Sequence, residues 1–280
     1  MEKNNYKTII LEMEHSVAKI IFNRTEVHNA FNSVLLTELD DALEEVKNDK
    51  SIRIVILTGK GKSFCAGADL NWMKEIINYT FKENLKESFH IAEIMHKIYS
   101  LPKPTIAMVN GAAIGGGTGF VSACDIVVAS ERAKFSLSEV KIGLVPAAIS
   151  PYVIRKIGEN KAREYFLTGI RITAEKACDL GLVNQVVPHE ELSQKVDEVV
   201  SLLMDSGPEA VANCKELIMK VPRLDWDEVK DFTANMIANL RVSDEGQEGM
   251  TAFLEKRKPV WAESKKQSRL RSPNGPKNKS

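Results

Sequence analysis

The chain has 280 residues, 44% of them apolar, so it can bury a sizeable core as one large domain or as one domain with a smaller appendage. Lys plus Arg and Asp plus Glu both total 38, and the resulting net charge of zero excludes a global field that would recruit nucleic acid or an anionic membrane. No stretch approaches the roughly 20 apolar residues of a membrane span, and residues 1–15 lack the apolar segment of a secretory signal. With four widely spaced cysteines, we expect a protein of the reducing cytoplasm.

Strands and helices are predicted to alternate through the first half of the chain. Residues 7–23 predict two strands joined by a polar turn, and residues 33–49 predict an amphipathic helix because leucines recur at spacings of three and four. Residues 52–59 form a continuous apolar run, as expected of a strand buried on both faces. The alternation from about residue 50 to 140 predicts parallel βαβ units and an α/β fold. Its later elements are a helix over 84–101, a strand over 104–111, a helix that begins in the following glycines, and strand material over 124–137.

The last third of the chain is predicted to be mainly helical, because apolar residues recur at helical spacing between breaks at Gly, Pro or Asp. The predicted helices lie within 160–169, 173–181, 191–207, 208–221 and 225–241. Residues 262–280 contain six Lys or Arg and almost no apolar side chains, so we expect a disordered basic tail. A basic tail can touch nucleic acid, but a solvated terminus is the simpler interpretation, and no nucleic-acid partner is expected.

The common glycine and metal motifs do not fit this sequence. The spacing G-x-G-x-x-G of a dinucleotide site fails because Phe120 stands where the last glycine belongs, and the first glycine of a P-loop would fall at Ile56. The five histidines are scattered, no C-x-x-C or H-E-x-x-H motif occurs, and no G-x-S-x-G elbow supplies a serine nucleophile. We therefore expect neither a bound metal nor a serine hydrolase.

Two glycine-rich and alanine-rich segments each follow a predicted strand and precede a predicted helix. They are "SFCAGADLNWM" at 63–73 and "NGAAIGGGTGF" at 110–120. The first amides of a helix lack partners within the helix and carry partial positive charge, so two such turns that face one another could hold one oxygen anion between two amides. Small residues would let a ligand approach the backbone closely. The alternative is that both are tight crossover turns in which glycine only permits close helix packing.

Glu139 is the candidate acid or base, because it lies in an otherwise apolar segment, "FSLSEVKIGLVP". Burial among apolar groups would raise the pKa of its carboxyl toward neutrality, where it could exchange protons. The alternative is an exposed glutamate that begins a helical turn. Cys65 lies beside the first glycine turn, but without an assigned histidine it is interpreted as a buried core residue and not as a nucleophile.

These segments, in this order and spacing, resemble the enoyl-CoA hydratase/isomerase family, also called the crotonase superfamily, over roughly residues 8–261. Further landmarks are "FNRTEVHNAFN", "PKPTIAMVNGAAIGGG", "ACDIVVAS", "LGLVNQVV" and "FLEKRKP". The resemblance implies a crotonase-like spiral of repeated ββα units over residues 1–200. It also implies a helical C-terminal trimerisation region over 201–261, followed by the tail at 262–280, with two trimers commonly forming a hexamer.

The resemblance also implies roles for individual residues. The amides of Ala68 and Gly116 would hold the thioester carbonyl of an acyl-CoA, and Glu139 would be the acid and base. Gly119 stands where two-glutamate hydratases of the family carry their first glutamate, so this sequence departs from the family's two-carboxylate pattern of water addition. Coenzyme A belongs to the substrate, so no separate cofactor is implied. The positions expected at the substrate or coenzyme A are Ala66, Gly67, Asp69, Leu70, Trp72, Gly115, Gly119 and Lys256.

The subgroup that these features resemble most is the bacterial hydratases of branched glutaconyl-CoA esters, such as the 3-methylglutaconyl-CoA hydratase of leucine breakdown. The expected reaction is the addition of water across the double bond of a CoA thioester. Two alternatives remain open. A single glutamate also suits an enoyl-CoA isomerase, and a relative that binds RNA or protein without catalysis is supported by the basic tail alone.

Overall fold

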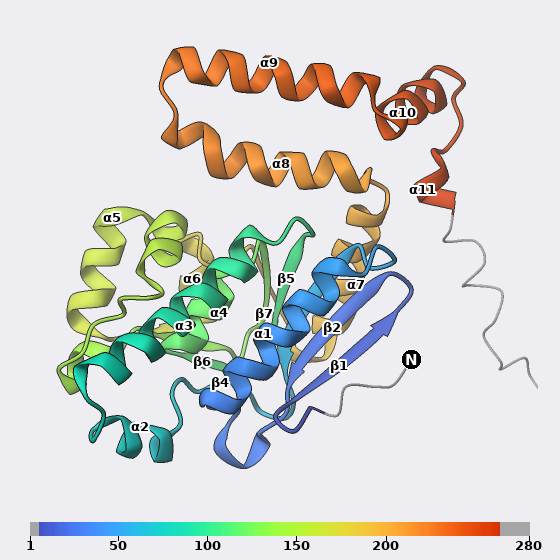
Figure 1. Ribbon diagram of the computed structural model, residues 1–280. Helices are drawn as coiled ribbons and strands as arrows, with labels where there is room; N and C mark the ends of the chain where they lie inside the picture. The colour runs from blue at the N-terminus through green and yellow to red at the C-terminus, as the bar shows by residue number, and fades with distance from the viewer. Residues whose placement is uncertain (1–5, 264–280) are drawn as a thin grey trace, which may run out of the picture. The chain divides into compact units, whose positions relative to one another are not determined.

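The apolar run at residues 54–59 forms a fully buried strand in the middle of a six-stranded sheet in the computed structural model, which describes residues 6–263 (Figure 1). The strand order is β1-β2-β3-β5-β7-β10. The β1–β2 hairpin is antiparallel and every other pairing is parallel, as expected when crossover helices join the strands. The strands are β1 (Ile9–Glu14), β2 (Val17–Phe22), β3 (Ile54–Gly59), β5 (Thr105–Val109), β7 (Ile126–Ser130) and β10 (Gln185–Val187).

Four short strands form a second sheet in the order β4-β6-β8-β9, and among the described residues none of them pairs with a strand of the first sheet. Its β4–β6 and β6–β8 pairs are parallel, and its β8–β9 pair is antiparallel. Each strand has three residues, too few for an alternating pattern to show in the sequence. Both glycine turns follow strands of this sheet. The strands are β4 (Ser63–Cys65), β6 (Ala112–Ile114), β8 (Lys134–Ser136) and β9 (Arg171–Thr173).

Two long helices, α1 (Ser33–Asn48) and α3 (Phe81–Ser100), pack beside each other (Figure 1). Asn32 caps α1 by accepting a hydrogen bond from the Leu35 amide, and Thr80 with Glu83 forms a capping box on α3. The other helices of residues 6–200 are η1 (Thr25–Val27), α2 (Leu70–Ile76), α4 (Gly116–Ala123), η2 (Glu139–Ile142), α5 (Ser150–Thr168), α6 (Ala174–Asp179), η3 (His189–Glu191) and α7 (Leu192–Met204), the last of which ends just beyond residue 200.

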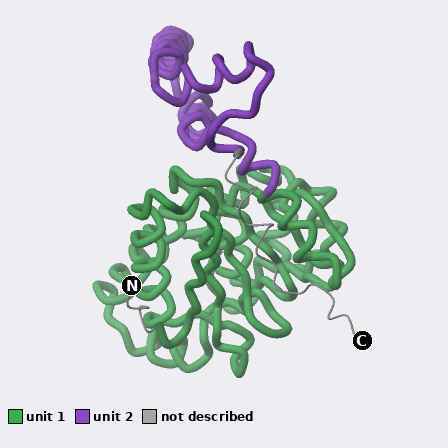
Figure 2. The backbone as a smooth tube through the Cα atoms, turned by 90° about the vertical axis from the view of Figure 1, so that its right-hand side faces the viewer, with its two compact units in different colours: residues 1–200 green, residues 201–280 purple. Residues whose placement is uncertain are grey.

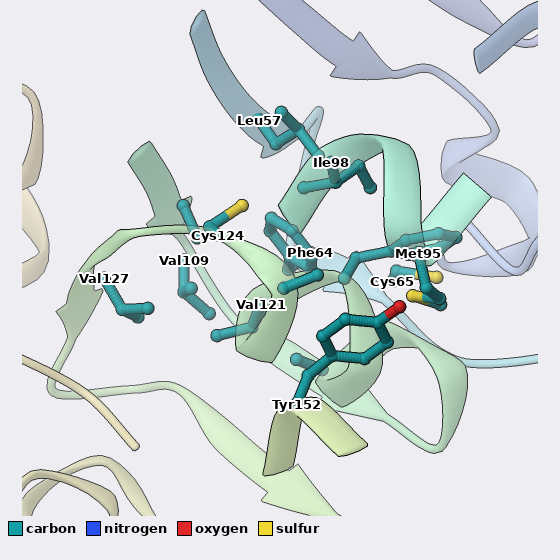
Figure 3. Close-up of a cluster of buried hydrophobic side chains, with 14 of the residues drawn as sticks. Leu57, Phe64, Cys65, Met95, Ile98, Val109, Val121, Cys124, Val127 and Tyr152 are labelled. Carbon is teal, nitrogen blue, oxygen red and sulfur yellow. The ribbon is translucent and has the colours of Figure 1, made fainter. Parts of the chain in front are cut away.

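The core of this part of the chain is filled by aromatic and branched side chains. Phe22 packs edge-on against Phe64 and tilted against Phe120, with ring centroids 5.5 Å apart in both pairs. In the close-up of part of the core, Phe64 and Val121 lie among residues from several elements, with Met95 and Ile98 of α3 beside them (Figure 3). The core therefore lies directly behind α4, the helix that begins in the glycines.

The chain divides into two units, residues 1–200 and residues 201–280 (Figure 2). Within the second unit, Asp225 with Glu228 forms a capping box on α9, and Glu245 accepts hydrogen bonds of 2.8 Å from the amides of Glu209 and Ala210 at the start of α8. The expected helices at 208–221 and 225–241 are present. The helices of this unit are α8 (Pro208–Lys220), η4 (Val221–Arg223), α9 (Trp226–Val242), α10 (Asp244–Leu254) and α11 (Val260–Glu263).

The α/β fold predicted from the sequence is confirmed, with parallel strands where the alternating pattern placed them. Apart from Ala262 and Glu263, the predicted basic tail lies outside the described residues. Over residues 6–263, none of the helices combines the length and apolar character needed to cross a bilayer.

Candidate active site

The first glycine turn joins β4 to α2 and is tied to an earlier loop by backbone hydrogen bonds. The Phe31 amide donates to the Gly67 carbonyl, and the Asp69 amide donates to the Phe31 carbonyl, both at 2.8 Å. Ala68 therefore forms a parallel bridge with Phe31. Within residues 6–263 the Ala68 amide has no hydrogen-bond acceptor, and Ala68 is only half-buried. Its N–H group is available to a ligand.

The second glycine turn joins β6 to α4. Gly115 has a φ of 53°, a left-handed value that favours glycine, and its amide donates to the Ser136 carbonyl at 2.8 Å. Gly116 is the first residue of α4 and is half-buried. Across the described part of the chain, no acceptor meets the Gly116 amide, as expected for the first turn of a helix. The partial positive charge at this helix end favours an anionic oxygen.

The two turns lie against each other. A methyl group added at Gly67 would lie 3.0 Å from the Ile114 carbonyl oxygen, and one added at Gly117 would overlap the Cys65 carbonyl oxygen. Only bare backbone permits this approach. The glycines that the sequence singled out are therefore needed to bring the turn carrying Ala68 to the turn carrying Gly116.

Glu139 begins η2 and lies beside the second turn. A methyl group added at Gly115 would lie 3.0 Å from Glu139 Oε1. Burial raises the pKa of the Glu139 carboxyl, and a hydrogen bond from its own backbone amide only partly opposes the shift. Oε2 is buried and meets no donor among residues 6–263. Glu139 is therefore half-buried next to the paired turns, unlike the fully exposed glutamate of the alternative interpretation.

An ion pair that the sequence analysis missed holds the first turn in place. Arg24 Nη2 donates to Asp69 Oδ2 at 2.7 Å, and both side chains are largely buried. Asp69 also caps α2 by accepting from the amides of Asn71 and Trp72. Burial raises the pKa of the Asp69 carboxyl, but the hydrogen bonds from Arg24 and the two amides lower it more, so the net pKa lies below its ordinary value. Asp69, expected at the substrate, is buried and holds the turn that carries Ala68.

Aromatic rings close the space behind the turns. A methyl group at Gly116 would lie 2.6 Å from Phe31 Cε1. The Phe31 ring contacts Trp72 and Phe120, with centroids 5.8 Å and 5.7 Å apart. Trp72 is only 4% exposed, so most of its ring fills space between elements. Leu70, by contrast, is 75% exposed at the start of α2, as a residue that contacts a ligand can be.

The Gly119 position is closed by apolar side chains. A methyl group there would overlap Ile149 Cγ2 and lie 2.9 Å from Ile149 Cβ and 3.1 Å from Met95 Cε. Ile149 and Met95 are themselves buried in the core. A larger side chain at this position, such as a glutamate, has no room unless Ile149 moves.

Three further residues that the sequence analysis discussed, Ala66, Cys65 and Lys256, lie in different surroundings. Ala66 lies in the first turn, where its amide donates to the His28 carbonyl at 3.1 Å. Cys65 is fully buried, and burial raises the pKa of its thiol to about 12, as expected of a core residue and not of a nucleophile. Lys256 belongs to the second unit, exposed after α10. Over residues 6–263 no group of three His, Cys, Asp or Glu side chains could hold a metal ion.

Two contacting turns with free amides, and one half-buried carboxyl beside them, define a site that can stabilise an oxygen anion next to a group that transfers protons. The family model for enoyl-CoA hydratase/isomerase matches residues 12–265. A short-chain-enoyl-CoA hydratase of Clostridium acetobutylicum is 36% identical over 260 residues, which cover 92% of this chain and 97% of that protein. A crotonyl-CoA hydratase of Syntrophomonas wolfei is 35% identical over 255 residues, covering 90% and 97%.

The crystal structure of an enoyl-CoA hydratase from Shewanella pealeana superposes with a TM-score of 0.89 at 38% identity, and the match covers 92% of this chain and 97% of that one. The chain therefore belongs to the enoyl-CoA hydratase/isomerase family and is an enzyme of that family. The family resemblance inferred from the sequence is confirmed, as is the crotonase-like fold.

Proposed function

We propose that this enzyme is an enoyl-CoA hydratase, with Ala68 and Gly116 as oxyanion donors and Glu139 as the single acid and base. The observation that carries the proposal is the position of Glu139. Its carboxylate lies over the bare Cα of Gly115, the residue that precedes the free amide of Gly116. One oxygen of this carboxylate meets no hydrogen-bond donor among the described residues.

The reaction then follows from the geometry. The thioester oxygen accepts hydrogen bonds from the two amides, which lowers the energy of the enolate that forms as water oxygen bonds to Cβ; one such donor contributes about 3–4 kcal/mol in a transition state. Glu139 takes one proton from the attacking water and then returns a proton to Cα. The C–C double bond is lost, one water is gained, and the glutamate ends as it began.

The proposed substrate is a branched glutaconyl-CoA ester such as 3-methylglutaconyl-CoA, which would place the enzyme in leucine breakdown. The support is the pairing of Gly119 with Ile149, which replaces a second carboxylate by an apolar wall. Ala66, Gly67 and Leu70 are proposed to contact coenzyme A, and Lys256 is proposed to reach the phosphates of a coenzyme A bound by a neighbouring subunit. No separate cofactor is needed, because coenzyme A arrives with the substrate.

We further propose that residues 201–261 mediate trimer formation and that two trimers form a hexamer in the cytoplasm. Apolar side chains remain exposed on this unit within the described residues, which supports an interface there. The four free cysteines fit a reducing compartment. Sedimentation of the purified protein tests the assembly.

An isomerase is the second candidate, because a single carboxyl can move a proton between two carbons without admitting water. Incubation with a 3-enoyl-CoA and with 3-methylglutaconyl-CoA, followed by mass spectrometry, separates the two activities. Only hydration adds the mass of one water. An unchanged mass with a shifted double bond would replace the hydratase proposal by the isomerase.

Replacing Glu139 by Gln tests the proposed role directly. We expect Glu139→Gln to lower hydration by at least about 10²-fold, the ordinary contribution of general acid–base catalysis. Glu131→Gln is the control, since Glu131 is exposed after β7. Near-parental hydration of 3-methylglutaconyl-CoA by Glu139→Gln would contradict the proposal.

A further inference from the structure

Glu87 of α3 is a carboxylate that none of the interactions above accounts for. Its side chain is half-buried, and its Oε2 is buried with no donor among residues 6–263. Ile94 and Ile98 follow it by seven and eleven residues, about two and three helical turns, so all three side chains point in nearly the same direction. Ile94 and Ile98 are fully buried. Glu87 therefore occupies the core-facing side of α3, where a charged group costs free energy unless it has a hydrogen-bond or charge partner.

Contacts between α3 and α5 indicate what Glu87 faces. Tyr99 packs against Tyr152 with ring centroids 5.3 Å apart, and one helical turn earlier Met95 and Ile149 meet at Gly119. The two chain segments thus run in the same sense. Moving two further turns back along α3, about 12 Å, reaches Glu87 and corresponds to the chain that precedes Ile149.

That preceding chain is the segment that begins with Glu139. It includes four apolar side chains that are exposed in the described chain, Val140, Ile142, Leu144 and Val145. Extrapolated along α3, this direction puts Glu87 on the side of the fold where η2 carries Glu139. Each has one buried carboxylate oxygen with no donor among the described residues. Two such acceptors suit a molecule that has two hydrogens to donate.

We infer that Glu87 is a second carboxylate of this site and holds the water molecule that adds to Cβ. The inference rests on the proposed hydratase function and deepens it. Glu87 accepts a hydrogen bond from one hydrogen of the water, and Glu139 accepts the other. As the water oxygen bonds to Cβ, the proton facing Glu139 moves to that carboxylate and is returned to Cα, while the hydrogen facing Glu87 stays on oxygen and becomes the hydroxyl hydrogen of the product.

Glu87→Gln tests this role, because the amide keeps the size of the side chain but presents donors to the water. Two rates are measured for each variant. One is hydration of the enoyl-CoA substrate. The other is exchange of the α-hydrogen of a saturated acyl-CoA in D2O, followed by NMR, which needs the oxyanion donors and Glu139 but no attacking water. Glu93→Gln is the matched control, since Glu93 is an exposed residue of the same helix.

We expect Glu87→Gln to lose at least about 10-fold in hydration while its α-hydrogen exchange stays within about 2-fold of the parent, and Glu87→Asp to recover part of the loss. Glu139→Gln should lose both activities, and Glu93→Gln neither. Parental hydration by Glu87→Gln, or equal loss of both rates, would overturn the role assigned to Glu87. A parent enzyme that exchanges α-hydrogen but adds no water would instead overturn the proposed function itself.

Discussion

The apolar wall at Gly119 predicts that a methyl group there destabilises the protein, even though alanine is the better helix former. Gly119→Ala in the middle of α4 would ordinarily gain about 1 kcal/mol. The added carbon, however, overlaps Ile149 Cγ2 and lies 2.9 Å from Ile149 Cβ. Because Ile149 Cβ is attached to the backbone, rotation of the side chain cannot relieve the second contact. Overpacking of this kind costs about 1–3 kcal/mol, so we expect a net loss of up to about 2 kcal/mol.

A double-mutant cycle shows whether Ile149 is the cause. Ile149→Ala alone should cost about 2–5 kcal/mol because it leaves a cavity in the core. In Gly119→Ala/Ile149→Ala the overlap with Cγ2 is gone and only the contact with Cβ remains, so the double variant should be more stable than the sum of the single changes by about 1–2 kcal/mol. Urea unfolding followed by circular dichroism, at one fixed protein concentration, measures all four proteins. Additive effects, or a Gly119→Ala variant more stable than the parent, would refute the reasoning.

Three further predictions concern titration. Burial raises the pKa of Glu139 above its ordinary 4.5, so the carboxylate form, which acts as the base, is lost as pH falls through that raised value. We therefore expect kcat/KM to fall on the acid side of the pH profile at a pH above 4.5. An acid limb at or below pH 4.5 would contradict this expectation. The same shift means that Glu139 contributes stability fully below pH 4.5 and loses it as pH rises through the folded pKa, so Glu139→Gln should gain thermal stability relative to the parent as pH increases. The pKa of Asp69 is lowered, so its contribution is present above the unfolded value of 3.8 and lost as pH falls through the folded pKa. Arg24→Met, which leaves Asp69 buried without its cation, should cost about 3–5 kcal/mol at neutral pH, and urea unfolding should show the deficit shrinking as Asp69 becomes protonated; a deficit independent of pH would assign the loss to packing.

Local signals in the sequence located the two glycine turns and the long elements. An apolar run such as residues 54–59 has one plausible structure, and glycines after a strand mark a place where backbone approaches backbone. The four short strands of the second sheet escaped notice because three residues show no period. Their pairing is decided by contacts between distant segments, such as Ser63 with Ala112.

The supporting residues of the site could not be found in the same way. Arg24 lies 45 positions before Asp69, and nothing in either neighbourhood marks them as partners. Glu87 falls in a helix whose other charged residues are exposed, except Lys97, which pairs with Asp40 and Glu44 of α1. Only the position of Glu87 on the stripe of Ile94 and Ile98 separates it from the exposed ones. That stripe is visible in the sequence at a spacing of seven and eleven. A search for charged residues on the apolar side of predicted helices would have found Glu87.

The backbone amides and the carboxyl of this site are held in place by separate contacts. The amides of Ala68 and Gly116 are held by contacts between the two turns and by the bridge to Phe31, none of which involves Glu139. Glu139 is carried by η2, and the space beside Gly119 is closed by Ile149, the residue before α5. A carboxyl can therefore be moved, lost or supplied from another helix without disturbing the two amides. Under the proposed function, the groups that hold water decide whether water is added or a proton is shifted, while the amide pair decides only that an enolate can form.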